Sequence, residues 1–370
     1  MRDELRPGVR GVLAAVALGA GAAAGGVLAL RRGDRRRRGG ASTAVRRVDL
    51  ERGEIRLAPT PDALAPGRYS IWFAGGSGHA RVGEVLRREG RAVVRRLLGV
   101  DLGDLGAAEE VRFNGWMHLG PATLDLPWRT ERVRTAQGSV PAWTVPGGEG
   151  RRWAVLVHGR SSTRQEALRA VPVLHAAGLT ALLPAYRGDG EAPDGARARY
   201  ALEDAEWVDV ESAVAHALEH GAREVVLVAF SSGASIALAT AHRSGLRSVV
   251  RGVVLDSPLL GRWDDPAEPD APVLILHGED DGVAPIAASR AFAAARADRV
   301  VLVPFDGGRH TRLWNRDPDR WDGALAAWLG GDAAALARLS RPGTASGRTA
   351  DRSRRAAGRR GARRRERAVR

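Results

Sequence analysis

Between residues 129 and 332, short apolar runs alternate with amphipathic stretches, and this alternation constrains the fold more than any other feature of the chain. Strands that are apolar throughout are buried on both faces of a sheet, and helices between them indicate parallel crossovers. The pattern predicts an α/β fold with a doubly wound, mainly parallel sheet. The expected helices cover 165–177, 205–220 and 233–242, and the expected strands are 153–157, 180–183, 224–228, 249–255, 273–276 and 300–303.

One serine follows the expected strand 224–228 in a setting typical of a sharp strand-to-helix turn. Such a turn needs very small residues two positions before and two positions after the nucleophile, because larger side chains would collide with neighbouring backbone. Ala229 and Gly233 occupy these positions around Ser231, which is therefore the candidate nucleophile. Ser232 is offset by one position, and we expect its backbone N–H to face an oxyanion hole. In a chain rich in Ala and Gly this pattern alone is weak.

Three further strand ends carry residues that complete a catalytic set. Asp281 follows strand 273–276, and His310 lies on a Gly-rich loop after strand 300–303. The order serine, acid, histidine is that of a Ser-His-Asp hydrolase with an α/β sheet. Asp280 is the alternative acid, but the spacing after the His-Gly turn favours Asp281. Asp280 and Glu279 are then solvated loop charges. The first strand, 153–157, ends in a second His-Gly turn at residues 158–159, a position suited to an oxyanion donor.

On these motifs the sequence resembles the α/β-hydrolase superfamily, in its serine aminopeptidase-like or lysophospholipase-like branch and its bacterial membrane-anchored type. The resemblance covers about residues 129–330. It implies Ser231 as nucleophile, Asp281 as acid and His310 as base, and it requires no cofactor or metal. It also implies that the backbone N–H groups of Arg160 and Ser232 stabilise the oxyanion. We name as substrate-pocket candidates His158, Gly159 and Trp314.

The chain departs from related proteins in one connection, and the resemblance does not decide between several functions. Only thirteen residues, 259–271, connect two expected strands where related proteins carry a helix or a longer cap, so we expect a minimal or absent lid and an open site. Part of the pocket wall would then come from residues 41–128 or from a membrane. We expect a hydrolase of carboxylic esters or thioesters. A peptidase or amidase, or a non-catalytic binding or scaffold protein, remains an alternative.

Residues 41–128 have the composition of a small, mostly β accessory module. Residues 54–57 and 69–73 read as strands between Pro and Gly turns, whereas 82–98 fits either a strand or a helix. The Gly-rich residues 75–79 lack the Lys-Ser/Thr ending of a phosphate loop and are interpreted as a turn.

The net charge of +14 belongs to the two ends of the chain. Residues 1–40 carry +6 and residues 341–370 carry +10, which leaves −2 on the rest. We interpret 333–370 as a disordered Arg-rich tail, because its final thirty residues cannot bury enough apolar surface to order. The tail lacks aromatic residues that stack on bases, so anionic membrane lipid is the expected partner and nucleic acid is not.

Residues 11–30 form an uncharged run of twenty residues followed by an Arg cluster, and we interpret 1–40 as an N-terminal membrane anchor. The positive-inside rule would then place the hydrolase domain, residues 129–332, in the cytoplasm at the cell membrane. A cleaved signal peptide that exports the protein and a low-complexity arm are the alternatives.

The residue inventory limits other chemistry. The chain has no cysteine, which excludes thiolate catalysis, iron–sulfur clusters, cysteine zinc sites and disulfides. His216 and His220 lie one helical turn apart, but the sequence shows no third ligand beside them. We interpret both as surface residues.

Overall fold

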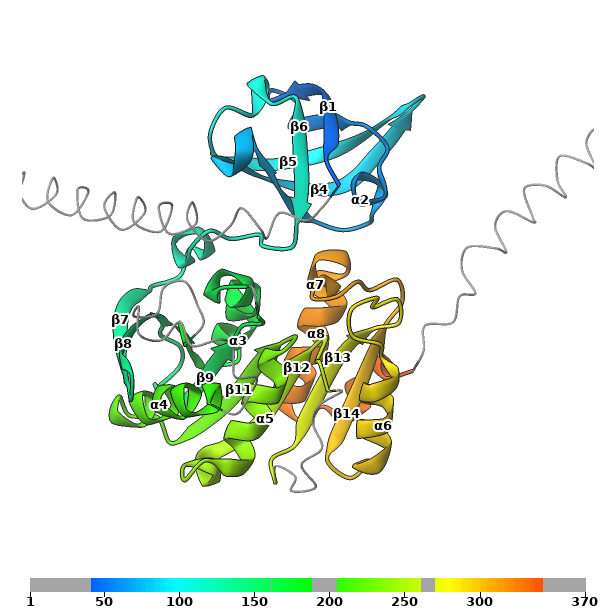
Figure 1. The fold of residues 1–370 in the computed structure, drawn as a ribbon. Helices are drawn as coiled ribbons and strands as arrows, with labels where there is room; N and C mark the ends of the chain where they lie inside the picture. The colour runs from blue at the N-terminus through cyan, green and yellow to red at the C-terminus, as the bar shows by residue number, and fades with distance from the viewer. Residues whose placement is uncertain (1–40, 161, 188–204, 261–269, 342–370) are drawn as a thin grey trace, which may run out of the picture.

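Two sheets organise the chain in the computed structural model, which describes residues 41–160, 162–187, 205–260 and 270–341 (Figure 1). The first is a closed antiparallel barrel, drawn in blue to cyan, and the second is a larger, mainly parallel sheet. The barrel strands run in the order β1-β2-β5-β4-β3-β6, with β1 Thr43–Asp49, β2 Glu54–Leu57, β3 Tyr69–Phe73, β4 Gly78–Glu89, β5 Ala92–Leu102 and β6 Glu110–Asn114. A short helix, α2 Pro61–Leu64, follows β2.

The strands expected at 54–57 and 69–73 are present with those bounds, and the ambiguous segment 82–98 is a hairpin of β4 and β5. Gly90 makes the turn of this hairpin possible, since its backbone has φ 56°, in the left-handed region that glycine adopts without strain. The barrel closes around an apolar core that includes Ile55, Ile71 and Phe113. Closure leaves no unpaired sheet edge, which is how a sheet of this size is kept from pairing with other chains.

A buried arginine fixes the loop between β2 and β3 to the barrel wall. Arg95 has no exposed surface, and its guanidinium donates hydrogen bonds to the backbone oxygens of Ala63, Ala65, Gly67 and Gly83 at 2.5–3.0 Å. Burial lowers the pKa of Arg95 to about 10, so the group stays cationic at neutral pH. The charge is thus satisfied by the dipoles of buried and partly buried peptide groups.

The larger sheet has eight strands in the order β14-β13-β12-β11-β9-β10-β8-β7. Strands β9 to β14 are mutually parallel, whereas β7 and β8 form an antiparallel hairpin that pairs with β10 at one edge. The bounds are β7 Arg129–Thr135, β8 Gly138–Val145, β9 Arg152–Val157, β10 Thr180–Pro184, β11 Glu224–Phe230, β12 Val250–Asp256, β13 Val273–Gly278 and β14 Val300–Phe305. The predicted doubly wound, mainly parallel sheet is therefore present.

Helices cover both faces of this sheet, and each strand divides its side chains between two cores. In β11, Val225 and Leu227 face the core shared with α4, α5 and α6, while Val226 and Val228 face the core shared with α3, α8 and α9. The helix bounds are α3 Val171–Ala176, α4 Glu206–Glu219, α5 Gly233–Arg243, α6 Ala287–Ala295, α7 Leu313–Arg316, α8 Pro318–Gly330 and α9 Ala333–Leu339.

The barrel docks on α7, which lies between the two sheets in Figure 1. The Asn315 backbone oxygen accepts from the Arg68 N–H at 2.7 Å, and the Asn315 amide donates to the Arg68 and Gly115 oxygens at 3.0 Å. Gly67 is required here, because a Cβ at this position would lie 2.0 Å from the Asn315 backbone oxygen. The close approach ties the barrel to the segment that follows His310.

Two expectations about the chain ends need correction. The expected cell-membrane location is overturned, because none of the helices in the described residues is long and apolar enough to cross a bilayer. The run 11–30 itself lies outside those residues. Residues 333–339, expected in the disordered tail, form α9, which Asp332 caps through its bond from the Ala335 N–H and which buries Leu336. The rest of the tail from 342 lies outside the described residues.

Substituting Arg95 tests whether the buried guanidinium holds the barrel together. We expect Arg95→Met to lower the free energy of unfolding by about 3 kcal/mol or more, since it leaves several buried carbonyls without a donor. The neighbouring Arg96 is the matched control, because its side chain is 49% exposed and pairs with the surface residue Glu84. Arg96→Ala should change stability by no more than about 0.5 kcal/mol. Equal effects of the two substitutions in urea denaturation would contradict this role.

Candidate active site

The candidate nucleophile lies at the carboxyl end of β11, in a strained turn. Ser231 has φ 54°, a left-handed conformation that is uncommon for a residue with a side chain. Gly233 enables the close packing of this turn, since a Cβ there would lie 2.6 Å from the Val157 oxygen and 2.7 Å from the His158 oxygen. Ala229 is fully buried. The small-residue pattern around the serine therefore has a direct steric cause.

The structure brings Ser231 into a hydrogen-bonded chain with His310 and Asp281. Ser231 Oγ lies 2.8 Å from His310 Nε2, and His310 Nδ1 lies 2.8 Å from Asp281 Oδ2. An ionised carboxylate can only accept, so Nδ1 carries the ring proton and Nε2 is free to accept from the serine hydroxyl. This is the geometry in which a histidine can act as general base toward a hydroxyl.

Asp281 is held ionised by the turn in which it lies. Burial raises the pKa of Asp281, but hydrogen bonds from His277 and His310 and from the N–H groups of Ala284 and Val283 outweigh it and hold the pKa well below its usual range. Glu279, interpreted from the sequence as a loop charge, is paired with Arg290 at the surface.

His277 closes this turn. It is fully buried, its Nε2–H donates to the Ala284 oxygen at 2.8 Å, and its Nδ1 lies 2.7 Å from Ser289 Oγ.

The predicted oxyanion turn lies directly against the nucleophile. The Arg160 N–H donates a hydrogen bond to Ser232 Oγ at 2.6 Å. The two predicted donor residues therefore lie next to each other, beside Ser231. Gly159 packs so closely that a Cβ would lie 2.9 Å from Ser231 Cβ. His158 is buried, and its backbone oxygen accepts from Tyr186 Oη at 2.5 Å while the two rings stack at 4.3 Å. Sequence reasoning missed Tyr186, although its position just after β10 was a signal.

A buried polar network behind the site was also missed. Ser257 Oγ donates to Asp256 Oδ1 at 2.8 Å and accepts from the Thr311 N–H at 3.0 Å. Arg169 donates to the Thr311 oxygen at 2.8 Å and lies 3.4 Å from Asp256 Oδ2. Thr311 is the residue after His310, so this network anchors the histidine loop from beneath. Only the position of Asp256-Ser257 at the end of β12 hinted at it.

Trp314, predicted beside the pocket, lies at the junction with the barrel. It is 7% exposed, its indole N–H donates to Asp322 Oδ1 at 2.9 Å, and the Arg68 guanidinium lies 5.3 Å from the ring centroid. The described contacts of Trp314 therefore join the two sheets.

Comparison with known proteins agrees with this architecture. Residues 148–269 match a family described as serine aminopeptidase, S33, and residues 44–114 match one described as a domain of unknown function, DUF8805. No curated protein matches the chain in sequence.

Solved structures resemble the region of the larger sheet. An esterase of Pyrococcus furiosus is 16% identical, and the match covers 57% of this chain and 94% of that one with a TM-score of 0.50. An α/β serine hydrolase without lid from Xanthomonas campestris is 18% identical over 55% and 94% of the two chains, with a TM-score of 0.47. Est1E of Butyrivibrio proteoclasticus with bound ferulic acid is 16% identical over 55% and 99%, with a TM-score of 0.47.

The sheet order and the family match over residues 148–269 together assign the region of the larger sheet to the α/β-hydrolase superfamily. Within that superfamily it is a serine hydrolase. The expected fold class is confirmed in the barrel and the larger sheet. The expected connection 259–271 lies mostly outside the described residues, so the absence of a lid stays a prediction.

Removing the Ser257 hydroxyl tests the anchor of the histidine loop. We expect Ser257→Ala to lower kcat for p-nitrophenyl acetate about tenfold with KM nearly unchanged, because His310 loses alignment while substrate contacts remain. Ser244 is a buried serine that bonds Glu211 at 2.6 Å, so Ser244→Ala is the matched control. A kcat for Ser257→Ala equal to that of the control would show that the network does not position the base.

The Trp314 contact gives a pH-dependent prediction. Burial raises the pKa of Asp322 from 3.8 to about 6, so the folded state favours the protonated carboxyl. The stability that this provides is complete below about pH 4 and is lost as pH rises through about 6. Asp322→Asn keeps an oxygen for the indole N–H but never ionises. We expect it to be about 1 kcal/mol more stable than the native chain at pH 8 and equal at pH 4, by urea denaturation. A difference that does not change with pH would contradict this assignment.

Proposed function

We propose that the protein hydrolyses carboxylic esters or thioesters through an acyl-enzyme formed on Ser231. The observation that carries this proposal is the continuous chain from Ser231 Oγ through His310 to Asp281, with both contacts at 2.8 Å. A nucleophile, a base and a group that orients the base are thus in reach of one another. The fold alone would not support it, because hydrolase folds host other functions.

In the proposed mechanism His310 Nε2 takes the proton from Ser231 as Oγ attacks the substrate carbonyl. Asp281 keeps the imidazole in the required tautomer and stabilises its cation. His310 then gives the proton to the leaving alcohol or thiol, which departs and leaves the acyl group on Ser231. A water attacks this ester with the same histidine as base, and the carboxylic acid is released.

The oxyanion is proposed to bind the N–H groups of Arg160 and Ser232. In the described state the Arg160 N–H bonds Ser232 Oγ at 2.6 Å, so a substrate oxygen would replace that hydroxyl as acceptor. The Ser232 side chain would rotate aside on substrate binding. Each lost donor of this kind costs about 3 kcal/mol of transition-state stabilisation.

We further propose that the barrel contributes to substrate selection, beside a site whose lid we predict to be minimal or absent. Asp62 of the barrel pairs with Arg309 and lies 3.6 Å from Arg312, so the barrel contacts residues on both sides of His310. This would make the accessory module a fixed wall near the acyl or leaving group. His158, Gly159 and Trp314 remain pocket candidates.

A peptidase or amidase is the second candidate, because residues 148–269 match the serine aminopeptidase family. The same three side chains would serve, since amide cleavage differs chiefly in protonation of the leaving group and in substrate positioning. Turnover of p-nitrophenyl esters compared with aminoacyl anilides separates the two activities. A larger kcat/KM for esters supports the esterase proposal, and a larger value for anilides supports the peptidase.

Labelling with a fluorophosphonate probe tests the nucleophile. We expect the full chain to be labelled and Ser231→Ala to lose the label completely, because only an activated serine attacks the probe. The adjacent Ser232 provides the matched control, and Ser232→Ala should retain labelling within about tenfold, since its proposed contribution is its backbone N–H. Persistent labelling of Ser231→Ala would contradict the assignment. A native chain that resists the probe would instead favour the non-catalytic binding or scaffold function.

A further inference from the structure

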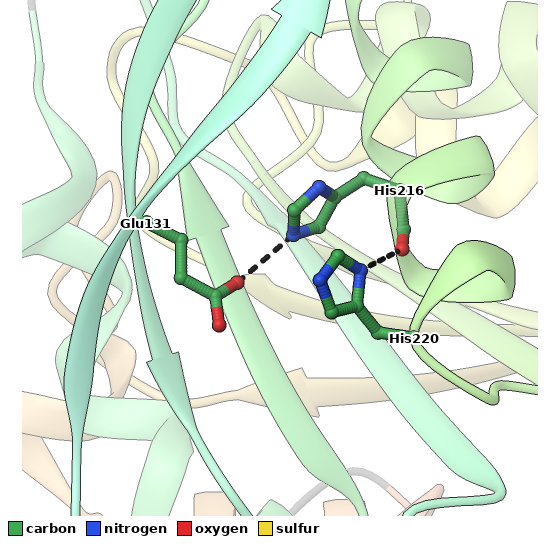
Figure 2. A group of neighbouring side chains, drawn as sticks. All are labelled: Glu131, His216 and His220. Atoms are coloured by element: carbon green, nitrogen blue, oxygen red, sulfur yellow. Dashed lines mark hydrogen bonds and ion pairs between the residues drawn. The ribbon is translucent and has the colours of Figure 1, made fainter.

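A cluster of metal-ligating side chains lies in a groove at the other edge of the larger sheet. Glu131 projects from β7, His216 projects from α4 toward it, and His220 directly follows the last residue of α4 (Figure 2). The groove has a volume of about 480 Å³ and is lined by Glu131, Arg132, Arg134, Ser212, Ala215, His216, Glu219 and His220. Strand β7 is four positions from β11 in the sheet, about 19 Å at ordinary strand spacing, so the cluster is separate from Ser231.

The three ligand-type side chains converge without any long rearrangement. His216 Nε2 lies 2.9 Å from Glu131 Oε2, and one ligand atom from each of the three residues lies within 4.8 Å of the others. The two imidazole rings face one another at 4.1 Å between centroids. Tetrahedral zinc with bonds of about 2.1 Å needs ligand atoms about 3.4 Å apart. The observed spacings bracket that value.

The outer contacts orient these groups as a metal site requires. His220 Nδ1–H donates to the His216 backbone oxygen at 2.7 Å, which leaves the lone pair of His220 on Nε2. Thr144 Oγ1 donates to Glu131 Oε2 at 2.8 Å, and Arg129 pairs with Oε1. Ligating histidines and carboxylates usually have fixed partners of this kind.

Two of the three ligand-type side chains are buried, so the cluster is more than a surface pair of histidines. The side chains of His216 and Glu131 are only 11% and 13% exposed, which corrects the surface interpretation of His216, whereas His220 is exposed as expected. A carboxylate that accepts hydrogen bonds from His216, Arg129 and Thr144 therefore lies beside two imidazoles.

We propose that Glu131, His216 and His220 bind one divalent transition-metal ion, with zinc the best fit. Two imidazole nitrogens and one carboxylate oxygen are a set that zinc accepts in tetrahedral coordination with one position left over. In the contact between His216 and Glu131 Oε2 the imidazole Nε2–H is the donor, so on metal binding the ring proton moves to Nδ1 through solvent and Nε2 binds the ion. Oε1 of Glu131 stays with Arg129. The ion joins β7 to α4, two elements whose ligands are 85 residues apart in sequence.

Arginines around the groove repel a cation and therefore weaken the binding of zinc. Arg129 contacts the ligand carboxylate, and Arg132 and Arg134 line the groove, while Glu219 adds one opposing charge. Dissolved salt screens the repulsion between these arginines and the zinc ion. Zinc should therefore bind more tightly as ionic strength rises, which is opposite to the behaviour of a site that attracts cations by surface charge.

Calorimetric titration of zinc into the full chain tests the site, with protein prepared without an oligohistidine tag and stripped with a chelator. We expect one zinc ion per chain, and at least about 100-fold weaker binding in His220→Ala and Glu131→Gln, each of which removes one ligand. His242, a half-buried histidine on α5, supplies the control His242→Ala, which should bind like the native chain. Circular dichroism before titration checks that each variant is folded.

Three further readouts separate this site from other histidines and from catalysis. Zinc should raise Tm by a few degrees in the native chain and His242→Ala but not in His220→Ala, because a ligand of the folded state stabilises it. Cobalt in place of zinc should give the visible bands of a four-coordinate ion. Turnover of p-nitrophenyl acetate by His220→Ala should equal that of the native chain. Zinc binding that is absent, or that is unchanged in both His220→Ala and Glu131→Gln, would overturn the proposal.

Discussion

The left-handed backbone at Ser231 is the constraint on which the rest of the site depends. A residue with a side chain at φ 54° costs about 1–3 kcal/mol and persists only where its surroundings hold it. The Ser231 N–H bonds the Asp256 oxygen at 3.0 Å, and the Ser231 oxygen accepts from the Leu259 N–H at 3.2 Å. Gly233 and Gly159 let the neighbouring strand end approach the turn. This backbone conformation directs Ser231 Oγ toward His310 Nε2, which lies 2.8 Å away.

The loop of His310 is fixed from three directions, and these fixings connect the two sheets. Asp281 holds the imidazole, and Ser257 with Arg169 holds Thr311 from below. On the far side, Asn315 bonds the barrel through its backbone and its amide. The hydrogen bonds of Asn315 therefore connect the barrel to the loop that carries the proposed general base, His310. We therefore expect a change in barrel packing to alter the position of His310.

Local patterns in the sequence were sufficient for the strands of the parallel sheet and for the three residues of the hydrogen-bonded chain. Apolar runs mark buried strands, and parallel strands bring residues at their carboxyl ends to one edge of a sheet. The docking of the barrel on Asn315 was not predictable in this way, because its partners lie about 200–250 residues away. The same holds for the Glu131 ligand of His216, which no helical spacing reveals.

Other features escaped sequence analysis because composition misled it. Arginine is abundant throughout the chain, so nothing marked Arg95 and Arg169 as buried groups with structural roles. Residues 333–339 were assigned to the basic tail, although the cap at Asp332 and the apolar Leu336 belong to a packed helix. In both cases burial, and not residue type, decides the role.

Identification of the acylated residue tests the central claim most directly. The full chain would be mixed with p-nitrophenyl acetate, quenched in acid within the first turnover, digested with trypsin and sequenced by mass spectrometry. Cleavage at arginine yields the peptide 224–243, which contains Ser231, Ser232 and Ser235, so fragmentation is needed to place the acyl group. The account predicts one acetyl group on Ser231. Acetyl on Ser232 or elsewhere, or turnover with no acylated peptide, would contradict it.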